Sequence, residues 1–253
     1  MSASSSSAKI AWVTGAGTGI GRELALQLAR KGWLVAASAR TAADLDTLVA
    51  ESPERITAFK LDVTDAEASL AVGKAIAASL GPVDLAIFNA GSYFPTTAGE
   101  FSVANFRRTV DVNLMGIVHG MGAVVPQMVA RRQGHIAVMG SLTGYFGLPT
   151  AASYGATKAA INSMAQAFMP DFERYGVTLS VINPGFVKTP ATDKNDFPMP
   201  FLMSVEKAVQ IIIAGLERKR FEIAFPWQMV WALRLLAALP HGLQFAITRR
   251  MLR

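Results

Sequence analysis

A tyrosine and a lysine stand four residues apart, among small residues, in the stretch SYGATKAA, residues 153–160. Four positions bring two side chains onto one face of a helix, so Tyr154 and Lys158 would lie one turn apart. A cation beside a phenol lowers the pKa of the phenol and prepares it for proton transfer near neutral pH. The same spacing also arises by chance on a surface helix with one solvated lysine, so the surrounding sequence must decide.

A glycine-rich stretch lies near the start of the chain. TGAGTGIG, residues 14–21, follows an apolar run and leads directly into a segment with helical periodicity. Gly15, Gly19 and Gly21 would let the backbone turn sharply and approach a diphosphate at the N-terminus of that helix. The position of this turn between a strand and a helix favours a nucleotide-binding role over that of an ordinary loop.

Segments typical of strands and helices alternate along the chain. Continuous apolar strands in such an alternation predict an α/β fold with a doubly wound parallel sheet of about seven strands and helices on both faces. The predicted strands are 9–15, 33–40, 56–63, 84–91, 135–141, 177–185 and 221–225. The predicted helices are 21–32, 42–51, 65–81, 106–134, 153–176 and 205–216, with 106–134 read as two helices and Pro126 bending the second.

Polar and small residues follow successive strands of this predicted sheet. Ligands of such sheets bind beyond the carboxyl ends of the strands, so these residues are candidates for a shared site. Each alone also fits a turn or a helix cap, but their joint placement indicates one site. They are Asp62, Asn89, Ala90, Gly91, Ser141, Pro184, Gly185 and Thr189.

The composition bounds the function classes. Hydrophobic residues make up 51% of the 253 residues and charged residues 17%, which predicts a folded domain with a sizeable core. The chain has no cysteine, which excludes disulfides, thiolate metal sites and cysteine nucleophiles and fits a cytoplasmic location. Residues 1–8 read as a flexible polar tail rather than a signal peptide, and we find no apolar run long enough for a membrane-spanning helix.

The positive charge is concentrated at the C-terminus. Residues 216–253 hold seven basic and two acidic residues, which leaves the main domain nearly neutral although the whole chain carries +6. A protein that binds nucleic acid through its main domain would carry its basic residues there, so we expect no nucleic-acid partner. The three histidines are scattered, and we assign no metal site.

Taken together, TGAGTGIG, NAG, Asn113, Ser141, YGATK and NPG resemble the short-chain dehydrogenase/reductase family in order and spacing. The resemblance covers residues 9–225 and fits the compact branch with the pattern TGxxxGxG. It implies a single Rossmann-type domain over 9–225, followed by a helical extension over 226–253. It also implies an oxidoreductase that moves a hydride between NADP(H) and a carbonyl or secondary alcohol, with the hydride chemistry supplied by the cofactor.

The resemblance also implies a role for each site residue. Tyr154 would be the general acid/base, Lys158 would stabilise the phenolate and hold the nicotinamide ribose, and Ser141 would donate to the substrate oxygen. Asn113 would hold a water that relays protons through Lys158. The implied cofactor contacts are Gly15, Thr18, Gly19, Ile20, Gly21, Arg40, Asp62, Val63, Asn89, Ala90, Gly91, Tyr154, Lys158, Pro184, Gly185, Val187 and Thr189.

The end of the second strand indicates which cofactor is preferred. An NAD enzyme usually places an acidic residue there, but this position is Ala39, and the following Arg40 suits a 2′-phosphate. The sequence therefore favours NADP, with NAD as the alternative. Thr18 stands where many NADP-preferring relatives have a second basic residue, so the preference is expected to be incomplete. Asp44 and Asp46 follow in a helical pattern and are expected in solvent.

Apolar loops predict an apolar substrate pocket under a lid at 188–204. About half of these side chains are expected to be ordinary core residues. The substrate classes that fit are a lipophilic ketone, an aldehyde, a steroid-like ketone and a 3-oxoacyl chain; a non-catalytic NADP(H)-binding regulator is the alternative function. The candidate pocket residues are Tyr93, Phe94, Leu142, Tyr145, Phe146, Leu148, Phe186, Phe197, Met199, Phe201 and Met203, with Lys188 and Lys194 in the lid.

Two surfaces predict partners. Small and apolar residues line one face of helix 153–176, and in the family this helix commonly pairs with its copy, which predicts a homodimer or homotetramer. The predicted helix 227–239 is apolar almost all round but too short to span a bilayer, and residues 240–242 break it before a second, basic segment. This extension either packs on the lid or a partner subunit, which we favour, or lies on a membrane surface.

Overall fold

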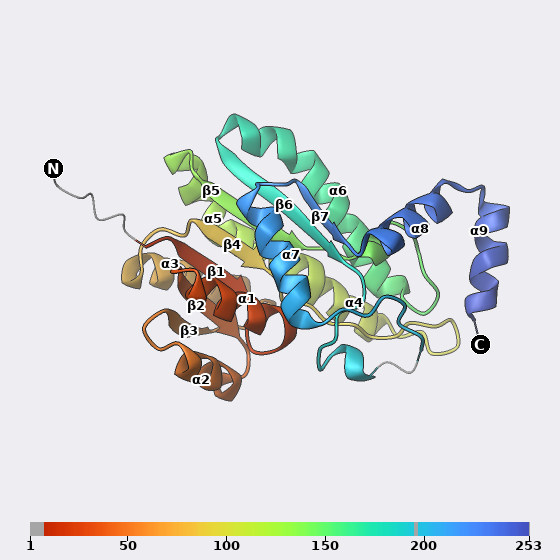
Figure 1. The fold of residues 1–253 in the computed structure, drawn as a ribbon, viewed down its shortest axis with the longest axis horizontal. Coiled ribbons are helices and arrows are strands. Elements are labelled where there is room, and N and C mark those ends of the chain that lie inside the picture. Colours follow the sequence, from red (N-terminus) through yellow and green to blue (C-terminus); the bar gives the residue numbers. More distant parts are fainter. Residues whose placement is uncertain (1–7, 195–196, 253) are drawn as a thin grey trace.

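Seven parallel strands form one sheet in the computed structural model, which describes residues 8–194 and 197–252. The strand order is β3-β2-β1-β4-β5-β6-β7, so the chain starts in the middle, winds to one edge and returns to wind to the other (Figure 1). This is the predicted Rossmann-type doubly wound sheet. The strands are β1 (Ile10–Thr14), β2 (Leu34–Ala39), β3 (Ile56–Lys60), β4 (Leu85–Phe88), β5 (Gly134–Met139), β6 (Val177–Pro184) and β7 (Glu222–Phe225).

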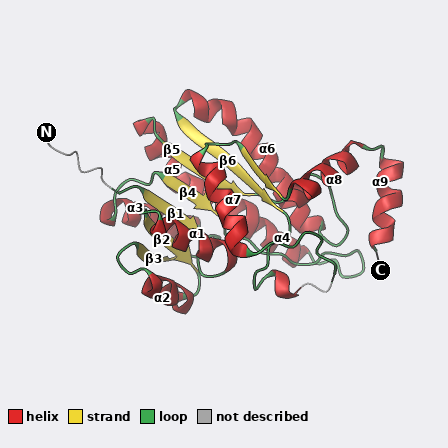
Figure 2. Ribbon diagram, in the orientation of Figure 1, coloured by secondary structure: helices red, strands yellow, loops and turns green. Residues whose placement is uncertain are grey.

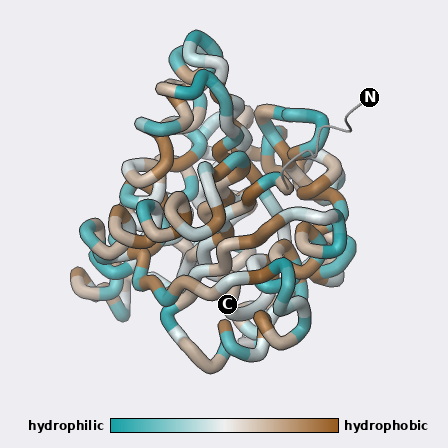
Figure 3. Tube along the Cα trace, turned by 90° about the vertical axis from the view of Figure 1, so that its left-hand side faces the viewer, coloured by the Kyte–Doolittle hydropathy of each residue, from teal (hydrophilic) through white to brown (hydrophobic). Residues whose placement is uncertain are grey.

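Helices cover both faces of the sheet (Figure 2), which explains why the strands are apolar on both sides. On one face, the core is built from residues of α1, α2 and α7; on the other, from residues of α3, α5 and α6. Apolar segments gather in the interior and polar ones at the outer turns (Figure 3). The helices are α1 (Gly19–Arg30), α2 (Ala42–Glu51), α3 (Ala66–Ser79), α4 (Val103–Val110), α5 (Gly116–Arg131), α6 (Ala152–Arg174) and α7 (Val205–Glu217).

The segment predicted as two helices over 106–134 is one helical stretch, Val103–Arg131. A π-helical turn, Asp111–Met115, joins α4 to α5, and Pro126 lies inside α5 without ending it. By length and composition this stretch is apolar enough to cross a bilayer, contrary to the expectation of no such segment. In the fold, however, its apolar residues Val124 and Met128 are fully buried in the core beside the sheet.

The C-terminal extension forms two helices, α8 (Trp227–Ala238) and α9 (His241–Thr248), separated at Pro240 as the sequence predicts. Val230, Leu233 and Leu236 of α8 pack on Leu142 in the loop after β5. The extension therefore contacts protein through one face of α8, but on the loop after β5 rather than on the predicted lid at 188–204, and its packing on a partner subunit stays a prediction. After α8, α9 extends away from the sheet (Figure 1).

Helix α5 packs closely on the sheet at Gly120 but not at Gly122, so the same substitution should have opposite effects at the two positions. A Cβ at Gly120 would lie 2.3 Å from the ring of Phe88, which itself meets Trp12 edge-on, whereas nothing lies within 4 Å of a Cβ at the exposed Gly122. Gly120→Ala should lower the free energy of unfolding by about 1–3 kcal/mol through overpacking. Gly122→Ala should raise it by up to about 1 kcal/mol through helix propensity. Urea unfolding measures both, and a stabilising Gly120→Ala would contradict the packing described.

Candidate active site

The turn between β1 and α1 is fastened to the end of β4. Gly15 and Gly19 have φ of 67° and 55°, in the left-handed region that favours glycine. The side chain of Asn89 donates to the backbone oxygens of Thr14 at 3.1 Å and of Gly15 at 3.3 Å. A Cβ at Gly21 would lie 2.2 Å from the backbone oxygen of Gly15, so a larger residue would push this turn apart. The turn thus presents bare backbone at the N-terminus of α1, as an approaching diphosphate requires.

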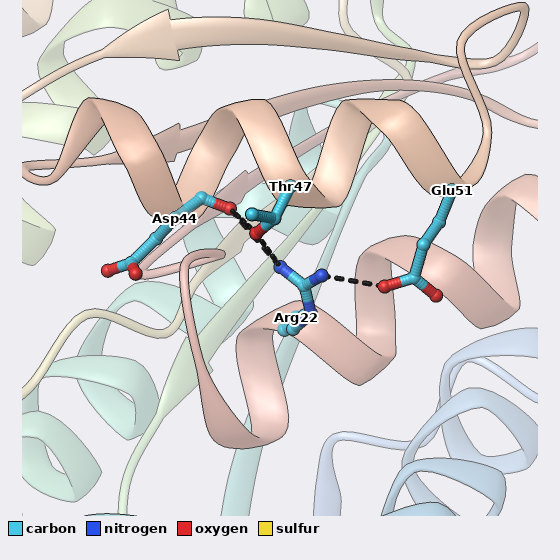
Figure 4. Close-up of polar contacts among 4 residues, drawn as sticks. All are labelled: Arg22, Asp44, Thr47 and Glu51. Atoms are coloured by element: carbon cyan, nitrogen blue, oxygen red, sulfur yellow. Dashed lines mark hydrogen bonds and ion pairs between the residues drawn. The ribbon is translucent and has the colours of Figure 1, made fainter.

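An arginine of α1 holds α2 in place beside this turn. The guanidinium of Arg22 donates to the backbone oxygen of Asp44 and to Thr47 Oγ1, both at 3.2 Å, and to Glu51 Oε1 at 2.6 Å (Figure 4). The carboxylate of Asp44 is thereby brought against the glycine turn: a Cβ at Gly17 would lie 3.2 Å from Asp44 Oδ2. The expectation that Asp44 is simply solvated is therefore wrong, since it is half-buried beside the turn.

Two further predicted cofactor contacts lie along the same edge. Arg40 is exposed directly after β2, and Asp62 follows β3. Burial alone would raise the pKa of Asp62, but hydrogen bonds from the backbone and hydroxyl of Thr64, with the positive charges of Arg40 and Arg108, lower it overall. The carboxylate of Asp62 is therefore an ionised acceptor at the sheet edge.

Asn113 is fully buried in the π-helical turn and anchors the loop after β4. Its Oδ1 accepts from the backbone N–H of Ser92 at 2.7 Å, and its Nδ2 donates to the backbone oxygen of Ser92 at 2.9 Å and to Thr157 Oγ1 at 3.3 Å. The side-chain amide thus joins the loop after β4 to α6. The predicted water relay through Asn113 remains a prediction.

Ser141, Tyr154 and Lys158 come together where β5 ends and α6 begins. Tyr154 and Ser141 share a side-chain hydrogen bond, and Lys158 Nζ lies 5.4 Å from the centre of the Tyr154 ring. Lys158 is only 2% exposed, and its Nζ donates to the backbone oxygen of Met139 at 2.6 Å. Tyr93, from the loop after β4, meets the Tyr154 ring edge-on at 5.4 Å.

Burial controls the protonation of this group. It lowers the pKa of Lys158 to about 7, so the ammonium is close to releasing its proton at neutral pH. Burial also raises the pKa of Tyr154, and the hydrogen bond with Ser141 offsets only part of that rise. The lowered phenol pKa expected from the neighbouring lysine is therefore not met in the protein chain alone, because desolvation outweighs the hydrogen bond with Ser141, the only contribution that lowers it.

Glu222, which the sequence analysis did not identify, supports the loop that carries Ser141 through Asn183. The backbone N–H of Ser141 donates to Asn183 Oδ1 at 2.9 Å, and Asn183 Nδ2 donates to Glu222 Oε1 at 3.1 Å. Glu222 also accepts from the hydroxyl of Tyr145 and from Arg234 of α8. Burial and the bond to Glu222 raise the pKa of Tyr145 to about 12, so it stays a donor. The signal that could have identified Glu222 is the presence of an acidic residue inside the otherwise apolar segment FEIAF, residues 221–225.

The first residues of the predicted lid pack against the glycine turn. A Cβ at Gly19 would lie 3.1 Å from Thr189 Cγ2, and Val187 pairs with Met203 across the two ends of the lid. Phe186 lies 6.0 Å from Phe197, ring centre to ring centre. The side chain of Lys194 lies outside the described residues.

The predicted pocket residues fall into two groups in the structure: some pack against α8, and others lie near Tyr154 or in the lid. Leu142, Tyr145, Phe146 and Leu148 pack against α8 and belong to the core, as about half of the set was expected to do. Of the two candidates in the loop after β4, Tyr93 lies beside Tyr154 and contacts its ring edge-on, whereas Phe94 lies against the guanidinium of Arg108.

The buried lysine generates a pH prediction. Its pKa is about 7 in the folded protein against a usual 10.5, so the unfolded chain binds the extra proton between these values. The free energy of unfolding should therefore rise with pH from about pH 7, by up to ~1.4 kcal/mol per unit. In Lys158→Met this rise should disappear. Urea unfolding at several pH values between 7 and 9 measures it, below the range in which tyrosines titrate. An equal rise in both proteins would place the titrating group elsewhere.

Comparison with known proteins agrees with this geometry. Residues 9–198 match the family described as short chain dehydrogenase. An uncharacterised oxidoreductase of Myxococcus xanthus is 39% identical over 246 residues, covering 96% of this chain and 97% of its own. The 3-oxoacyl-(acyl-carrier-protein) reductase of Thermotoga maritima is 29% identical over 74% of this chain and 77% of its own. A short-chain dehydrogenase structure from Streptomyces avermitilis superposes with a TM-score of 0.83 at 25% identity, covering 97% of this chain and 98% of that one. The chain belongs to the short-chain dehydrogenase family of oxidoreductases.

Proposed function

We propose that this oxidoreductase uses NADP(H) to reduce a lipophilic ketone, aldehyde or 3-oxoacyl-type substrate to the corresponding alcohol. The observation that carries the proposal is the meeting of Ser141, Tyr154 and the buried Lys158 at the carboxyl edge of the sheet. The cysteine-free composition supports a cytoplasmic location within this proposal.

The residues present fit a nicotinamide dinucleotide. Gly15 and Gly21 pack too closely on the backbone of Ala90 and of Gly15 to carry side chains, so the turn offers bare backbone that suits a diphosphate, and Asp62 is an ionised acceptor farther along the edge. When bound, the cofactor supplies or accepts the hydride. The other predicted contacts, Thr18, Ile20, Val63, Ala90, Gly91, Pro184, Gly185 and Val187, belong to the turns, strand ends and first helical turn along this edge.

The protein's own groups handle the proton. Tyr154 would donate its hydroxyl proton to the substrate oxygen as the carbonyl is reduced. Ser141, whose hydroxyl shares a hydrogen bond with Tyr154, would stabilise the charge that develops on the same oxygen. Lys158 Nζ, with a pKa of about 7, can hold or release a proton near neutral pH and so restore the protonated phenol.

The surroundings of Tyr154 support an apolar substrate. Tyr93 packs on the Tyr154 ring, and Phe94 follows it in the same loop. Phe186 and Phe197 meet at the lid. The similarity to a 3-oxoacyl-(acyl-carrier-protein) reductase supports a 3-oxoacyl chain among the substrate classes.

A homo-oligomer is part of the proposal. The face of α6 predicted to pair with a second subunit is not covered within the chain: Phe168 is 40% exposed, and Ala159, Ser163 and Ala167 are exposed beside it. Met115 and Val118, at 36% and 38% exposed, add apolar surface on the adjoining helical stretch. These faces support a symmetric dimer or tetramer, which analytical ultracentrifugation measures.

Tyr154→Phe tests the catalytic role. The change removes the acidic proton and keeps the ring, so turnover of a carbonyl panel with NADPH should fall at least ~10²-fold. Binding of NADPH, measured by its fluorescence, should be nearly unchanged. Tyr93→Phe, which keeps the edge-on ring contact, serves as the matched control. Normal turnover in Tyr154→Phe would refute the assignment, and absence of turnover in the wild type across the panel would favour a non-catalytic NADP(H)-binding protein.

Arg40 and Asp44 test the cofactor preference from opposite directions. Arg40→Ala should weaken NADPH binding roughly 10- to 100-fold, the effect of losing a charge-assisted hydrogen bond, and leave NADH binding unchanged. Asp44→Asn should tighten NADPH binding roughly fivefold, because it removes a negative charge beside the glycine turn. Asp46→Asn, exposed on the same helix, should change neither. Titration by nucleotide fluorescence measures all three, and equal weakening of both cofactors by Arg40→Ala would give Arg40 another role.

A further inference from the structure

The two faces of α8 are both apolar, but only one is covered. Val230, Leu233 and Leu236 are each 8% exposed against the Ser141 loop. On the opposite face, Trp227, Trp231 and Leu235 follow one another at four-residue spacing and are 69%, 58% and 65% exposed. This outer face of α8 forms a continuous apolar stripe in solvent, which a soluble surface helix does not normally present.

The second helix and the residues after it carry further exposed apolar side chains. Only Gln244 and Thr248 of α9 are buried, and Gln244 Nε2 donates to the backbone oxygens of Leu236 and Ala237 in α8. The amide of Gln244 therefore fixes α9 onto the end of α8. The exposed apolar side chains that follow are Leu243, Phe245, Ile247, Met251 and Leu252, each between 41% and 59% exposed. We call these residues, with Trp227, Trp231 and Leu235, the C-terminal apolar face.

The charge around this face has one sign. After Glu222 the chain contains arginines and no acidic residue. Arg234 is paired with Glu222, whereas Arg249 and Arg250 form no ion pair among the residues that the structure describes. An apolar face with tryptophans and unpaired arginines complements a lipid surface that offers acyl chains and negative headgroups.

A second copy of the chain fits this face less well. A two-fold symmetric contact would place the same patch on both sides, because such interfaces are self-complementary. Such a contact would gather the arginines of both copies into one interface, with no acidic side chain in the patch to pair with them. An anionic bilayer supplies the missing negative charge.

We propose that the C-terminal apolar face docks the protein on the surface of an anionic bilayer. The tryptophans of α8 lie at the level of the headgroups, and Arg249 and Arg250 contact the lipid phosphates. Neither helix spans the bilayer, because the twelve residues of α8 rise only ~18 Å against the ~30 Å of a hydrocarbon core. The inner face of the same helix packs on Leu142, next to Ser141, so the helix that docks also contacts the loop of the candidate active site.

Vesicle flotation of the full chain tests the proposal. The wild type should float with vesicles of phosphatidylcholine and phosphatidylglycerol at 3:1 in 0.1 M salt, and much less with pure phosphatidylcholine. Trp227→Ser/Trp231→Ser/Leu235→Ser should abolish flotation. Leu235→Ser alone should weaken it, whereas Leu70→Ser, an exposed leucine of α3, should not. Arg249→Gln/Arg250→Gln should weaken binding to the anionic vesicles roughly 30-fold, and Lys74→Gln/Lys207→Gln, with the same loss of charge elsewhere, should have little effect.

Each contrary outcome overturns the proposal. A wild type that stays unbound with anionic vesicles refutes it, as does a triple variant that floats as well as the wild type. If sedimentation instead shows that the triple variant dissociates an oligomer and no form binds lipid, a second copy covers the face. Should the triple variant fail to fold by circular dichroism, the arginine pair, which is exposed, decides the question.

Discussion

A buried ammonium organises the active edge of this protein. Lys158 lies in the interior of the fold, where a charge loses most of its hydration, and its Nζ donates to the backbone oxygen of Met139 at the end of β5. That contact fixes the start of α6 against the sheet. The loop after β5 packs closely on the backbone of the same lysine. Gly144 in this loop leaves no room for a side chain, because a Cβ there would lie 2.7 Å from the backbone oxygen of Lys158. The position of Tyr154, one turn earlier, is set by this packing.

The rest of the site is built by side chains that hold backbone. Asn89 fastens the glycine turn, Asn113 fastens the loop after β4, and Asn183 fastens the backbone of Ser141. An amide carries both a donor and an acceptor, so a single asparagine can satisfy two backbone groups of a loop at once. Three loops that come from distant parts of the sequence are thereby held at one edge without metal or disulfide chemistry in the described chain.

The sequence was sufficient for the features that depend on local pattern. Apolar runs located the strands, and the spacing of Tyr154 and Lys158 located the face of α6 that carries both side chains. The π-helical turn at Asn113 was not predictable, because a one-residue change of helical register leaves hydrophobic periodicity almost unaltered. Asp44 was misplaced because its position depends on Arg22 of another helix. Glu222 was missed because its partners come from three separate elements and no short-range pattern marks them.

The hydrogen bonds that link Ser141 to Asn183, Asn183 to Glu222 and Glu222 to Arg234 also set the order in which a growing chain can complete this site. They join residues 42, 39 and 12 positions apart, and the last two run through β7 and α8, the end of the chain. During synthesis the glycine turn leaves the ribosome well before β7 and α8. A nascent chain can therefore form this turn before Glu222 and Arg234 exist to support the loop of Ser141. The loop of Ser141 reaches its final position only after β7 and α8 have been made.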